Sequence, residues 1–334
     1  MRAIRVLHFG LGPIGASVAR QIAARPGFKL VGGIDTDPAK VDRDLGDVIG
    51  LNRRLGLRVQ SEAAKALKRA KPDVVVHCTS SSVREVLPQI ETILKTRTPI
   101  VSTTEELSYP GYTHIRQARQ IHNWARKAKA AVVATGVNPG FAMDALPIML
   151  TAVCERVDRV SVTRVQDARL RRLPFQQKIG AGLTTEQFQR KVDDGSVRHV
   201  GLTESIAMIA DALGWTLDRI TDDIQPKLAA VTVSSEFLAV DPGYVCGIIQ
   251  DGVGYRKQDA VIRLHFEAYL GAPETFDAIE IDGTPRLSVK IPTGIHGDIA
   301  TASLVVNTIP RALTAAPGLH TMRDLPLPSF FPGR

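Results

Sequence analysis

The clearest indication of the fold lies at residues 4–15, which read Ile4-Arg5-Val6-Leu7-His8-Phe9-Gly10-Leu11-Gly12-Pro13-Ile14-Gly15. An apolar run of β character leads directly into the pattern Gly-x-Gly-x-x-Gly, and an amphipathic segment follows at 16–24. This order of strand, glycine turn and helix is typical of a dinucleotide-binding unit, in which the helix start holds the phosphates. A tight turn without a ligand is the alternative. The residues expected to contact the cofactor at this turn are Gly10, Gly12, Pro13, Ile14 and Gly15.

The strand after this first helix supports the dinucleotide interpretation. Residues 29–34 again have β character, and Asp35 follows them, 20 residues after Gly15. An acid at this position can bind the ribose hydroxyls of a dinucleotide. Because a carboxylate repels a 2′-phosphate, Asp35 predicts a preference for NAD(H). Lys40 or Arg43 could offset this repulsion, so NADP(H) stays open as an alternative.

The bulk composition is that of an ordinary soluble globular protein. The 334 residues are enough for two domains, with 44% hydrophobic and 23% charged residues. No apolar run reaches the roughly 18 residues of a membrane span, and the chain opens directly into a strand, so neither a membrane partner nor a signal peptide is expected. The cysteines, Cys78, Cys154 and Cys246, are too scattered for a metal site or a disulfide framework, which favours the cytoplasm. The net charge of +8 is spread out without interleaved aromatics, so no nucleic-acid partner is expected.

Strands and helices alternate through the first part of the chain. We expect helices at 62–70, 83–94 and 112–129, with strands at 74–78, 99–103 and 131–135. Such alternation implies right-handed crossovers and a parallel sheet, so residues 1–140 predict a doubly wound Rossmann domain. Ligands bind such sheets at the carboxyl ends of the strands. Thr79 and Ser80 follow one strand there and are expected near the nicotinamide ribose, while Ser82 could instead cap the next helix.

The pattern changes after residue 140, and residues 141–297 predict a second domain of α+β character. Strand-like runs at 159–166, 230–240, 245–254, 260–269 and 276–281 suggest a mainly antiparallel sheet. Helices are expected at 184–192, where Thr184 and Gln187 form a capping-box pattern, and at 203–213. Residues 298–334 predict a helix at 299–309, stopped by Pro310, and a proline-rich tail that packs back on the first domain. The arginines at 159, 164, 169, 171 and 172 are interpreted as surface residues, because no fixed anionic partner is evident.

The best candidate for acid–base chemistry is the pair Glu105 and Glu106, which follows the strand at 99–103. Adjacent carboxylates on a loop tend to point in different directions, so we expect one of them to face the cleft. A carboxylate held short of water can act as a general base and can stabilise a cationic intermediate. A pair of solvated acids at a helix start is the alternative.

Four stretches together carry a resemblance to a known family. They are residues 8–15, Ser-Thr-Thr-Glu-Glu-Leu-Ser-Tyr-Pro at 102–110, Gly-Val-Asn-Pro-Gly-Phe-Ala-Met-Asp at 136–144, and Gln-Lys-Ile-Gly-Ala-Gly-Leu-Thr at 177–184. The chain resembles the NAD(P)H-dependent 2,4-diaminopentanoate dehydrogenases and the related native amine dehydrogenases. More distantly, its layout is similar to that of dihydrodipicolinate reductase. The resemblance covers most of the chain.

The resemblance implies reversible oxidative deamination of an amine, or reductive amination of a ketone or aldehyde with ammonia. It implies that a glutamate is the catalytic carboxylate, which we assign to Glu106, with Glu105 second. It also implies a homodimer formed through the sheet of the second domain. These implications make the expected partners a small amine or carbonyl substrate and ammonia, with NAD(P) as the cofactor and no metal.

Further site residues follow from the same resemblance. Asn138, Pro139 and Gly140 are expected beside the nicotinamide, and Phe141 and Met143 at the wall of the substrate pocket. Asn307 is expected to contact the carboxamide. The structural alternatives are a simple turn for 138–140, core packing for the two apolar residues and an internal hydrogen bond for Asn307. Among His199, His265 and His296, the last is the best candidate to line the pocket.

One departure bears on the substrate. Dihydrodipicolinate reductases carry a motif of paired histidines and a lysine for a dicarboxylate, and this chain lacks the pair. A substrate without carboxylates is therefore favoured. Two other functions stay open: another oxidoreductase on this architecture, of the homoserine or saccharopine dehydrogenase type, and a non-catalytic dinucleotide-binding regulator.

Overall fold

The computed structural model describes residues 2–333, which form two compact units. Unit 1 comprises the chain up to Phe141 together with the segment from His296 onward, and unit 2 comprises Ala142–Ile295. The expected domain limits lay after residues 140 and 297, one and two residues from these divisions. No helix in the described part of the chain is long and apolar enough to cross a membrane.

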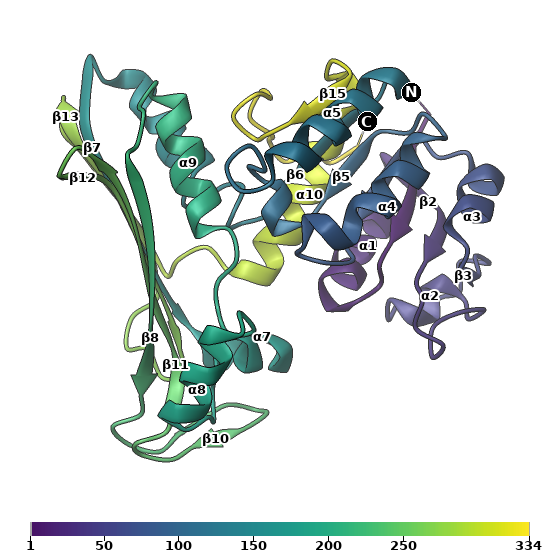
Figure 1. Cartoon of the computed structure of the whole chain (residues 1–334). Helices are drawn as coiled ribbons and strands as arrows, with labels where there is room; N and C mark the ends of the chain where they lie inside the picture. The colour runs from purple at the N-terminus through teal and green to yellow at the C-terminus, as the bar shows by residue number, and fades with distance from the viewer. Residues whose placement is uncertain (1, 334) are drawn as a thin grey trace. The chain divides into compact units, whose positions relative to one another are not determined.

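Unit 1 is built on a parallel sheet with the spatial order β15-β6-β5-β4-β1-β2-β3 (Figure 1). Its strands are β1 (Ile4–Phe9), β2 (Phe28–Ile34), β3 (Val59–Gln60), β4 (Val74–His77), β5 (Ile100–Ser102), β6 (Ala131–Ala134) and β15 (Gly318–His320). Its helices are α1 (Pro13–Ala24), α2 (Leu45–Val48), α3 (Ala63–Ala70), α4 (Val83–Leu94), α5 (Ile115–Ala128) and α10 (Gly297–Thr314), with the 3-10 turn η1 (Glu105–Leu107). The doubly wound parallel sheet expected from the sequence is confirmed.

Apolar strand residues form the centre of unit 1. Leu7, Val75, Ile100 and Val132 come from four neighbouring strands and are fully buried. The strands read as continuous apolar runs because helices cover the sheet. In Figure 1, α10 and α1 lie together, and Gln21 of α1 contacts Ser303 of α10 at 3.1 Å. The C-terminal segment therefore completes this unit.

One expectation for the C-terminal segment was wrong, and one strand in it was not predicted. Pro310 does not stop the last helix, because α10 continues to Thr314. Proline removes one backbone hydrogen bond and crowds the preceding turn, but the buried face formed by Val305, Val306, Ile309 and Ala312 keeps the segment on the sheet. The sequence also gave no sign of β15, whose three residues pair in parallel with β6. The proline-rich end has no regular structure up to residue 333, as expected.

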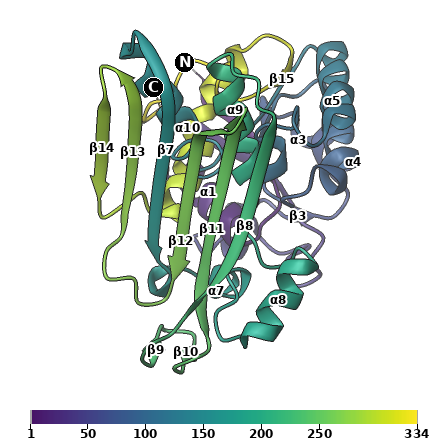
Figure 2. The same cartoon turned by 60° about the vertical axis from the view of Figure 1, so that its left-hand side comes forward.

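Unit 2 is a mixed, mainly antiparallel sheet, as expected, with the order β14-β13-β7-β12-β11-β8 (Figure 2). Among the described strands of this second sheet, only β7 and β12 pair in parallel. The strands are β7 (Arg156–Asp167), β8 (Arg219–Leu228), β11 (Val245–Arg256), β12 (Asp259–Tyr269), β13 (Phe276–Thr284) and β14 (Leu287–Pro292), and a small hairpin pairs β9 (Val233–Ser234) with β10 (Ala239–Val240). The helices are α6 (Ala145–Leu150), α7 (Leu173–Lys178), α8 (Thr185–Asp193) and α9 (Leu202–Ala212), with 3-10 turns η2 (Thr151–Val153) and η3 (Ala168–Leu170).

Helix α9 packs on one face of this sheet at a point that requires glycine. A Cβ added at Gly252 of β11 would lie 2.8 Å from Ile206 of α9, so the missing side chain lets helix and strand approach.

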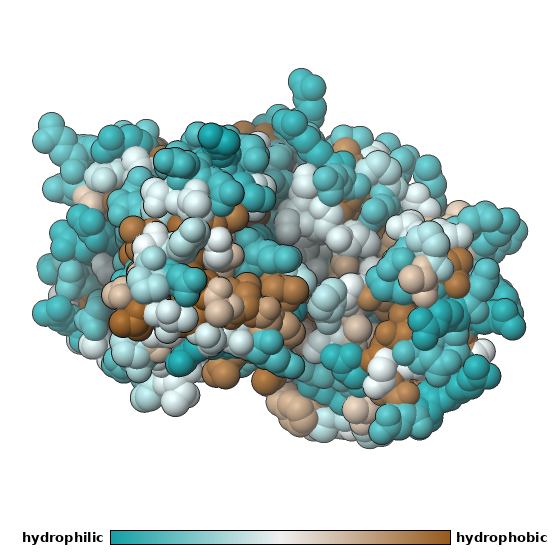
Figure 3. Space-filling view, turned by 90° about the horizontal axis from the view of Figure 1, so that it is seen from below, coloured by the Kyte–Doolittle hydropathy of each residue, from teal (hydrophilic) through white to brown (hydrophobic). Residues whose placement is uncertain are grey.

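The expected capping box of Thr184 and Gln187 at the start of α8 is confirmed. The single strand expected at 230–240 is instead the β9–β10 hairpin. Exposed apolar side chains near this hairpin include Val231 and Phe237, and Figure 3 shows apolar residues gathering in patches on the face seen from below.

Candidate cofactor site and active-site loop

In the glycine turn between β1 and α1, the fold requires two of the glycines but not the third. Gly10 has a φ of +92°, and a Cβ there would lie 2.2 Å from the Cys78 carbonyl oxygen. A Cβ at Gly15 would lie 2.0 Å from the Gly10 carbonyl oxygen. At Gly12, however, a Cβ would meet no atom of the described chain within 4 Å. Gly12 precedes the N-terminus of α1, so the open space there fits the close approach of a pyrophosphate.

Asp35 lies where β2 ends and is tied to the glycine turn. Its Oδ2 accepts the Leu11 N–H at 2.7 Å, and its Oδ1 accepts the Asp37 N–H at 2.9 Å. The Lys40 ammonium lies 3.4 Å from the Asp35 carboxylate and 3.1 Å from that of Asp37. Burial alone would lower the pKa of Lys40, but its two carboxylate partners outweigh burial and raise it. A positive charge is therefore held beside Asp35, as the NADP(H) alternative requires.

A buried histidine organises the end of β4. His77 is fully buried, its Nε2–H donates to the Gln89 side-chain oxygen at 2.6 Å, and its Nδ1 lies 3.1 Å from the Ser102 hydroxyl of β5. Burial lowers the pKa of His77 to about 4, so the ring is neutral at neutral pH. The Thr79 hydroxyl donates to the same Gln89 oxygen at 2.7 Å. The segment after β4 is thus fixed by hydrogen bonds from α4 and β5.

The serines that follow have protein partners. Ser80 donates its hydroxyl to Glu85 of α4. Ser82 occupies the residue before α4, but in the described structure its side chain makes no capping hydrogen bond. The expected capping by Ser82 is therefore wrong, and the side chain that binds the start of α4 here is that of Glu106, which accepts the N–H of Val83 at 2.8 Å.

The two glutamates of η1 are held by different partners. The Glu106 Oε2 accepts the Val83 N–H at 2.8 Å and lies 3.0 Å from Nε2 of His114, the residue before α5. The Glu105 Oε2 accepts the Ser81 hydroxyl at 2.7 Å. The side chain of Glu106 is 27% exposed, so it is held in place but still accessible. The Glu106 carboxylate thus lies at the carboxyl edge of the sheet with a defined orientation.

The loop after β6 lies at the same edge of the sheet, beside β5. Asn138 is buried, and the Asn138–Pro139 peptide bond is cis. Gly140 has a φ of +122°, and a Cβ there would lie 2.6 Å from the Gly136 nitrogen, so this turn requires glycine. The Thr301 hydroxyl of α10 accepts the Val137 N–H at 3.2 Å. Strands β4, β5 and β6 therefore end in three neighbouring loops that carry Thr79, the glutamate pair and Asn138.

The structure places Asn307 away from this edge. Its side-chain oxygen accepts an Arg25 N–H at 2.6 Å and the Phe331 N–H at 3.1 Å. Arg25 follows the C-terminus of α1, which lies at the opposite edge of the sheet from the glycine turn. The expected contact with the nicotinamide carboxamide is therefore wrong, and the structural hydrogen bond left open as its alternative is the one observed.

The other pocket candidates lie in different units. His296 precedes α10, and its Nδ1 accepts the Ile299 N–H at 3.5 Å, which leaves the neutral ring's proton on Nε2. Phe141 is half-buried at the end of the first segment of unit 1. Met143, in unit 2, is fully buried. His265, also in unit 2, is bound between Asp251 and Glu267 at 2.7 and 2.9 Å.

Arg164 and Arg171 are buried, although both were expected at the surface. Arg164 is 2% exposed and forms an ion pair with Asp277, which is equally buried. Arg164 also donates to the Ile295 carbonyl oxygen at 2.6 Å, and Asp277 accepts the Ile295 N–H at 2.7 Å. The pair fixes the last residue of unit 2. No group of three or more His, Cys, Asp or Glu residues that could hold a metal ion occurs among residues 2–333.

Sequence reasoning missed the residues that hold the glutamates and the adjoining loop. His114 and His77 were not singled out, because neither lies in a motif. Ser81 belongs to the hydroxyl run at 79–82, which was expected near the nicotinamide ribose or at the helix start and not beside the glutamates. His114 comes eight residues after Glu106, at the boundary between loop and helix. The only available signal was its position directly before a strongly amphipathic helix.

Residues 4–135 match the model of the dihydrodipicolinate reductase N-terminus, and residues 141–333 match that of the 2,4-diaminopentanoate dehydrogenase C-terminal domain. The 2,4-diaminopentanoate dehydrogenase of Acetoanaerobium sticklandii is 30% identical over 98% of this chain and 95% of its own length. The chain belongs to the 2,4-diaminopentanoate dehydrogenase family. It is therefore an enzyme of the oxidoreductase class.

One further relative and two solved structures are also similar to this chain. An amine dehydrogenase of Streptomyces virginiae is 26% identical over 97% of this chain and 96% of its own. The solved structure of an amine dehydrogenase from Mycobacterium smegmatis covers 99% of this chain and 98% of its own, with a TM-score of 0.89 and 24% identity. The fold is shared more loosely with a dihydrodipicolinate reductase from Paenisporosarcina sp. TG-14, at a TM-score of 0.55 and 14% identity over 96% of this chain and 99% of that one.

Proposed function

We propose that the protein is an NAD(P)-dependent amine dehydrogenase, which deaminates an amine oxidatively and, in reverse, aminates a ketone or aldehyde with ammonia. The observation that carries the proposal is the Glu106 carboxylate, held by Val83 and His114 at the carboxyl edge of a dinucleotide-binding sheet. The names of the two relatives, both dehydrogenases of amines, support the reaction class.

The cofactor is assigned to the glycine turn and the neighbouring strand ends. The open space at Gly12 and the N-terminus of α1 fit a pyrophosphate, and Asp35 fits a ribose. Thr79, Ser80, Asn138, Pro139 and Gly140 would flank the nicotinamide, which supplies or takes up the hydride when bound. We propose a preference for NAD(H) from Asp35, with NADP(H) accepted because Lys40 offsets its charge.

The glutamate has two tasks in the amination direction. Ammonium must lose a proton before its nitrogen can attack the carbonyl carbon, and a carboxylate can accept that proton. After water leaves, the iminium carries a positive charge, which the same oriented carboxylate stabilises. We assign both tasks to Glu106, because hydrogen bonds from two elements orient it, and we place Glu105 second.

The substrate is proposed to be a small amine or carbonyl compound without carboxylates. This follows from the absence from the sequence of the paired-histidine motif of dihydrodipicolinate reductases. Phe141, Met143 and the Nε2–H of His296 are the proposed pocket residues. We further propose that the protein works as a homodimer in the cytoplasm.

The test is a panel of ketones, aldehydes and diamines, followed by NADH absorbance with and without ammonium. NADH consumption that requires both a carbonyl compound and ammonium supports the proposal. Glu106→Gln should abolish this consumption and leave NADH binding intact, with Glu105→Gln as the matched comparison. If only Glu105→Gln is inactive, the catalytic role moves by one residue. If NADH binds but no amine or carbonyl compound reacts in either direction, the proposed reaction is wrong.

A further inference from the structure

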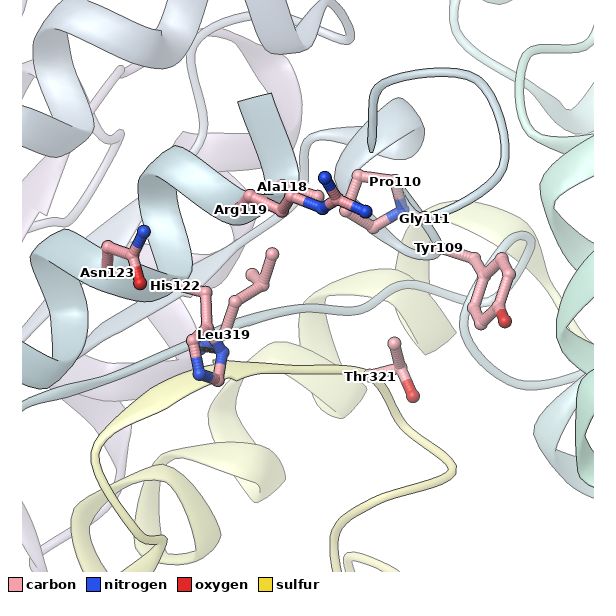
Figure 4. Close-up of a pocket in the computed structure, with 9 residues that line it drawn as sticks. All are labelled: Tyr109, Pro110, Gly111, Ala118, Arg119, His122, Asn123, Leu319 and Thr321. Carbon is pink, nitrogen blue, oxygen red and sulfur yellow. Dashed lines mark hydrogen bonds between the residues drawn. The ribbon is translucent and has the colours of Figure 1, made fainter. Parts of the chain in front are cut away.

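A cavity of about 460 Å³, open to solvent, lies at the surface of unit 1, beside the edge of the sheet formed by β6 and β15 (Figure 4). Its walls come from the loop 109–111, from α5 and from β15 with the residue that follows it. This volume is in the range of small-molecule sites. None of the cofactor residues assigned above lines it, so its presence is not explained by the dinucleotide.

The walls combine apolar surface with one cationic side chain, that of the exposed Arg119. Pro110, Ala118 and Leu319 supply apolar surface from three different elements. Arg119 and His122 come from α5, and Figure 4 shows the guanidinium of Arg119 beside Pro110 and Gly111. The Nδ1 of His122 accepts the Leu319 N–H at 3.4 Å, so its Nε2–H remains as the donor. No Asp or Glu is among the described residues that line the cavity.

The charge of α5 favours an anion at this cavity. The helix carries Arg116, Arg119, Arg126 and Lys127, and its sequence contains no Asp or Glu. Within residues 2–333, Arg119 has neither an ion pair nor a side-chain hydrogen bond. A guanidinium matches a carboxylate with two parallel hydrogen bonds, and such charge-assisted pairs are stronger than neutral ones. The unpaired cation beside apolar walls defines the chemistry of the ligand.

We propose that this cavity binds a second small molecule, one with an apolar or aromatic body and a single carboxylate. The body packs on Pro110, Ala118 and Leu319, and the carboxylate pairs with Arg119. None of the residues proposed above for the cofactor or the substrate lines this cavity, so we place the second ligand at a site separate from that of the reaction.

The cavity is connected to the glutamate loop. The Pro110 carbonyl oxygen accepts the N–H of His114 at 2.9 Å, and the His114 ring contacts Glu106. A ligand that packs against Pro110 and Gly111 would therefore contact the segment that holds His114, and His114 orients the proposed catalytic carboxylate. A regulatory effect on the rate follows, and this part of the inference rests on the proposed function.

The binding test uses 1-naphthylacetate as the probe, titrated calorimetrically into the full-length protein saturated with NADH. We expect binding that Arg119→Gln weakens at least about tenfold, whereas Arg126→Gln, which removes the same charge from α5 outside the cavity, leaves it unchanged. Ala118→Leu, which fills part of the cavity, should also weaken it. The uncharged analogue 2-(1-naphthyl)ethanol should bind more weakly than the acid. Displacement of the probe by NADH, or equal affinity in the Arg119→Gln and wild-type proteins, would overturn the proposal.

The regulatory part has its own readout. The rate of ammonium-dependent NADH consumption should change at least twofold with the probe in the wild type and stay constant in Arg119→Gln. Intact probe binding with an unchanged rate refutes regulation, while the binding site stands. Probe binding without any ammonium-dependent activity would instead count against the proposed function.

Discussion

The Nε2 of His114 lies 3.0 Å from the Oε2 of Glu106, and the same oxygen accepts the N–H of Val83 at 2.8 Å. One carboxylate oxygen is thus fixed by the start of α4 and by the residue before α5. Glu106 is therefore oriented before any substrate arrives, which is the condition under which a carboxylate contributes most to a reaction.

Replacing His114 tests whether this orientation matters. We expect His114→Gln to lower kcat about 10- to 100-fold, because a hydrogen bond to a charged group is worth roughly 1.5–3 kcal/mol and each 1.4 kcal/mol is about tenfold in rate. The dissociation constant of NADH should stay within about twofold. Steady-state kinetics and NADH fluorescence measure the two quantities. His320→Gln is the matched control, since the His320 ring hydrogen-bonds to the Ala316 carbonyl oxygen, far along the chain from Glu106. A His114→Gln enzyme with wild-type kcat would show that His114 does not orient the carboxylate.

The glycines of the first turn should separate folding from cofactor binding. Gly12 has a φ of −66° and free space around its Cβ position, so Gly12→Ala should fold normally and bind NADH at least about tenfold more weakly. Gly15→Ala should instead lower the melting temperature, since its Cβ would lie 2.0 Å from a carbonyl oxygen. Thermal melting and NADH titration distinguish the two variants. Wild-type NADH affinity in Gly12→Ala would contradict the assignment of the pyrophosphate to this turn.

Lys40 provides the test of coenzyme choice. Asp35 is a poor target for this purpose, because its carboxylate also holds the Leu11 N–H and its loss would disturb the turn. We expect Lys40→Gln to raise the KM for NADPH about tenfold and that for NADH less than threefold, since only the 2′-phosphate needs the extra positive charge. Lys29→Gln, an exposed position on β2, is the control. Equal changes for the two coenzymes would exclude Lys40 as the residue that offsets Asp35.

The elements that were predicted well are those in which local pattern and burial agree. The limits of α4 were predicted to the residue. Pro72 and the serine run flank the preceding strand, and a long amphipathic pattern begins directly after the serines. Strand β8 was missed because it is an edge strand: Pro226 and charged residues at 219, 222, 223 and 227 hide its alternation. The helical pattern at 299–309 was recognised, but a buried face that carries a helix past a proline depends on tertiary contacts and leaves no local signal.

The candidate site likewise contains residues that could be predicted from the sequence and residues that could not. The Gly-x-Gly-x-x-Gly turn, Asp35 and the glutamate pair are contiguous motifs and could be found by reading along the chain. His114, Ser81 and His77 act on those motifs across strands and helices, so only the folded structure joins them. For Asn307, the sequence correctly indicated that a polar residue in an apolar helix needs a partner. It did not indicate that Arg25 and Phe331 of the tail are that partner.

His77 should make the stability of the protein depend on pH. Its pKa is about 4 in the folded chain and 6.5 when unperturbed, because burial disfavours the charged ring. Between these values the unfolded chain binds more protons, so acid favours unfolding. The contribution of His77 is therefore complete above pH 6.5 and is lost as the pH falls through 4.

The expected size is on the order of 3 kcal/mol, since each pH unit across that window corresponds to about 1.4 kcal/mol. Urea unfolding of the wild type and of His77→Gln at pH 7.5, 5.5 and 4.5 measures it. Glutamine can hydrogen-bond with Gln89 and Ser102 but does not titrate. As the pH falls, the unfolding free energy of the wild type should therefore decrease more than that of His77→Gln. His8, whose pKa burial lowers to about 3, gives both proteins the same acid sensitivity and cancels in the comparison. A gap that stays constant across the three pH values would mean that His77 is not buried in its neutral form.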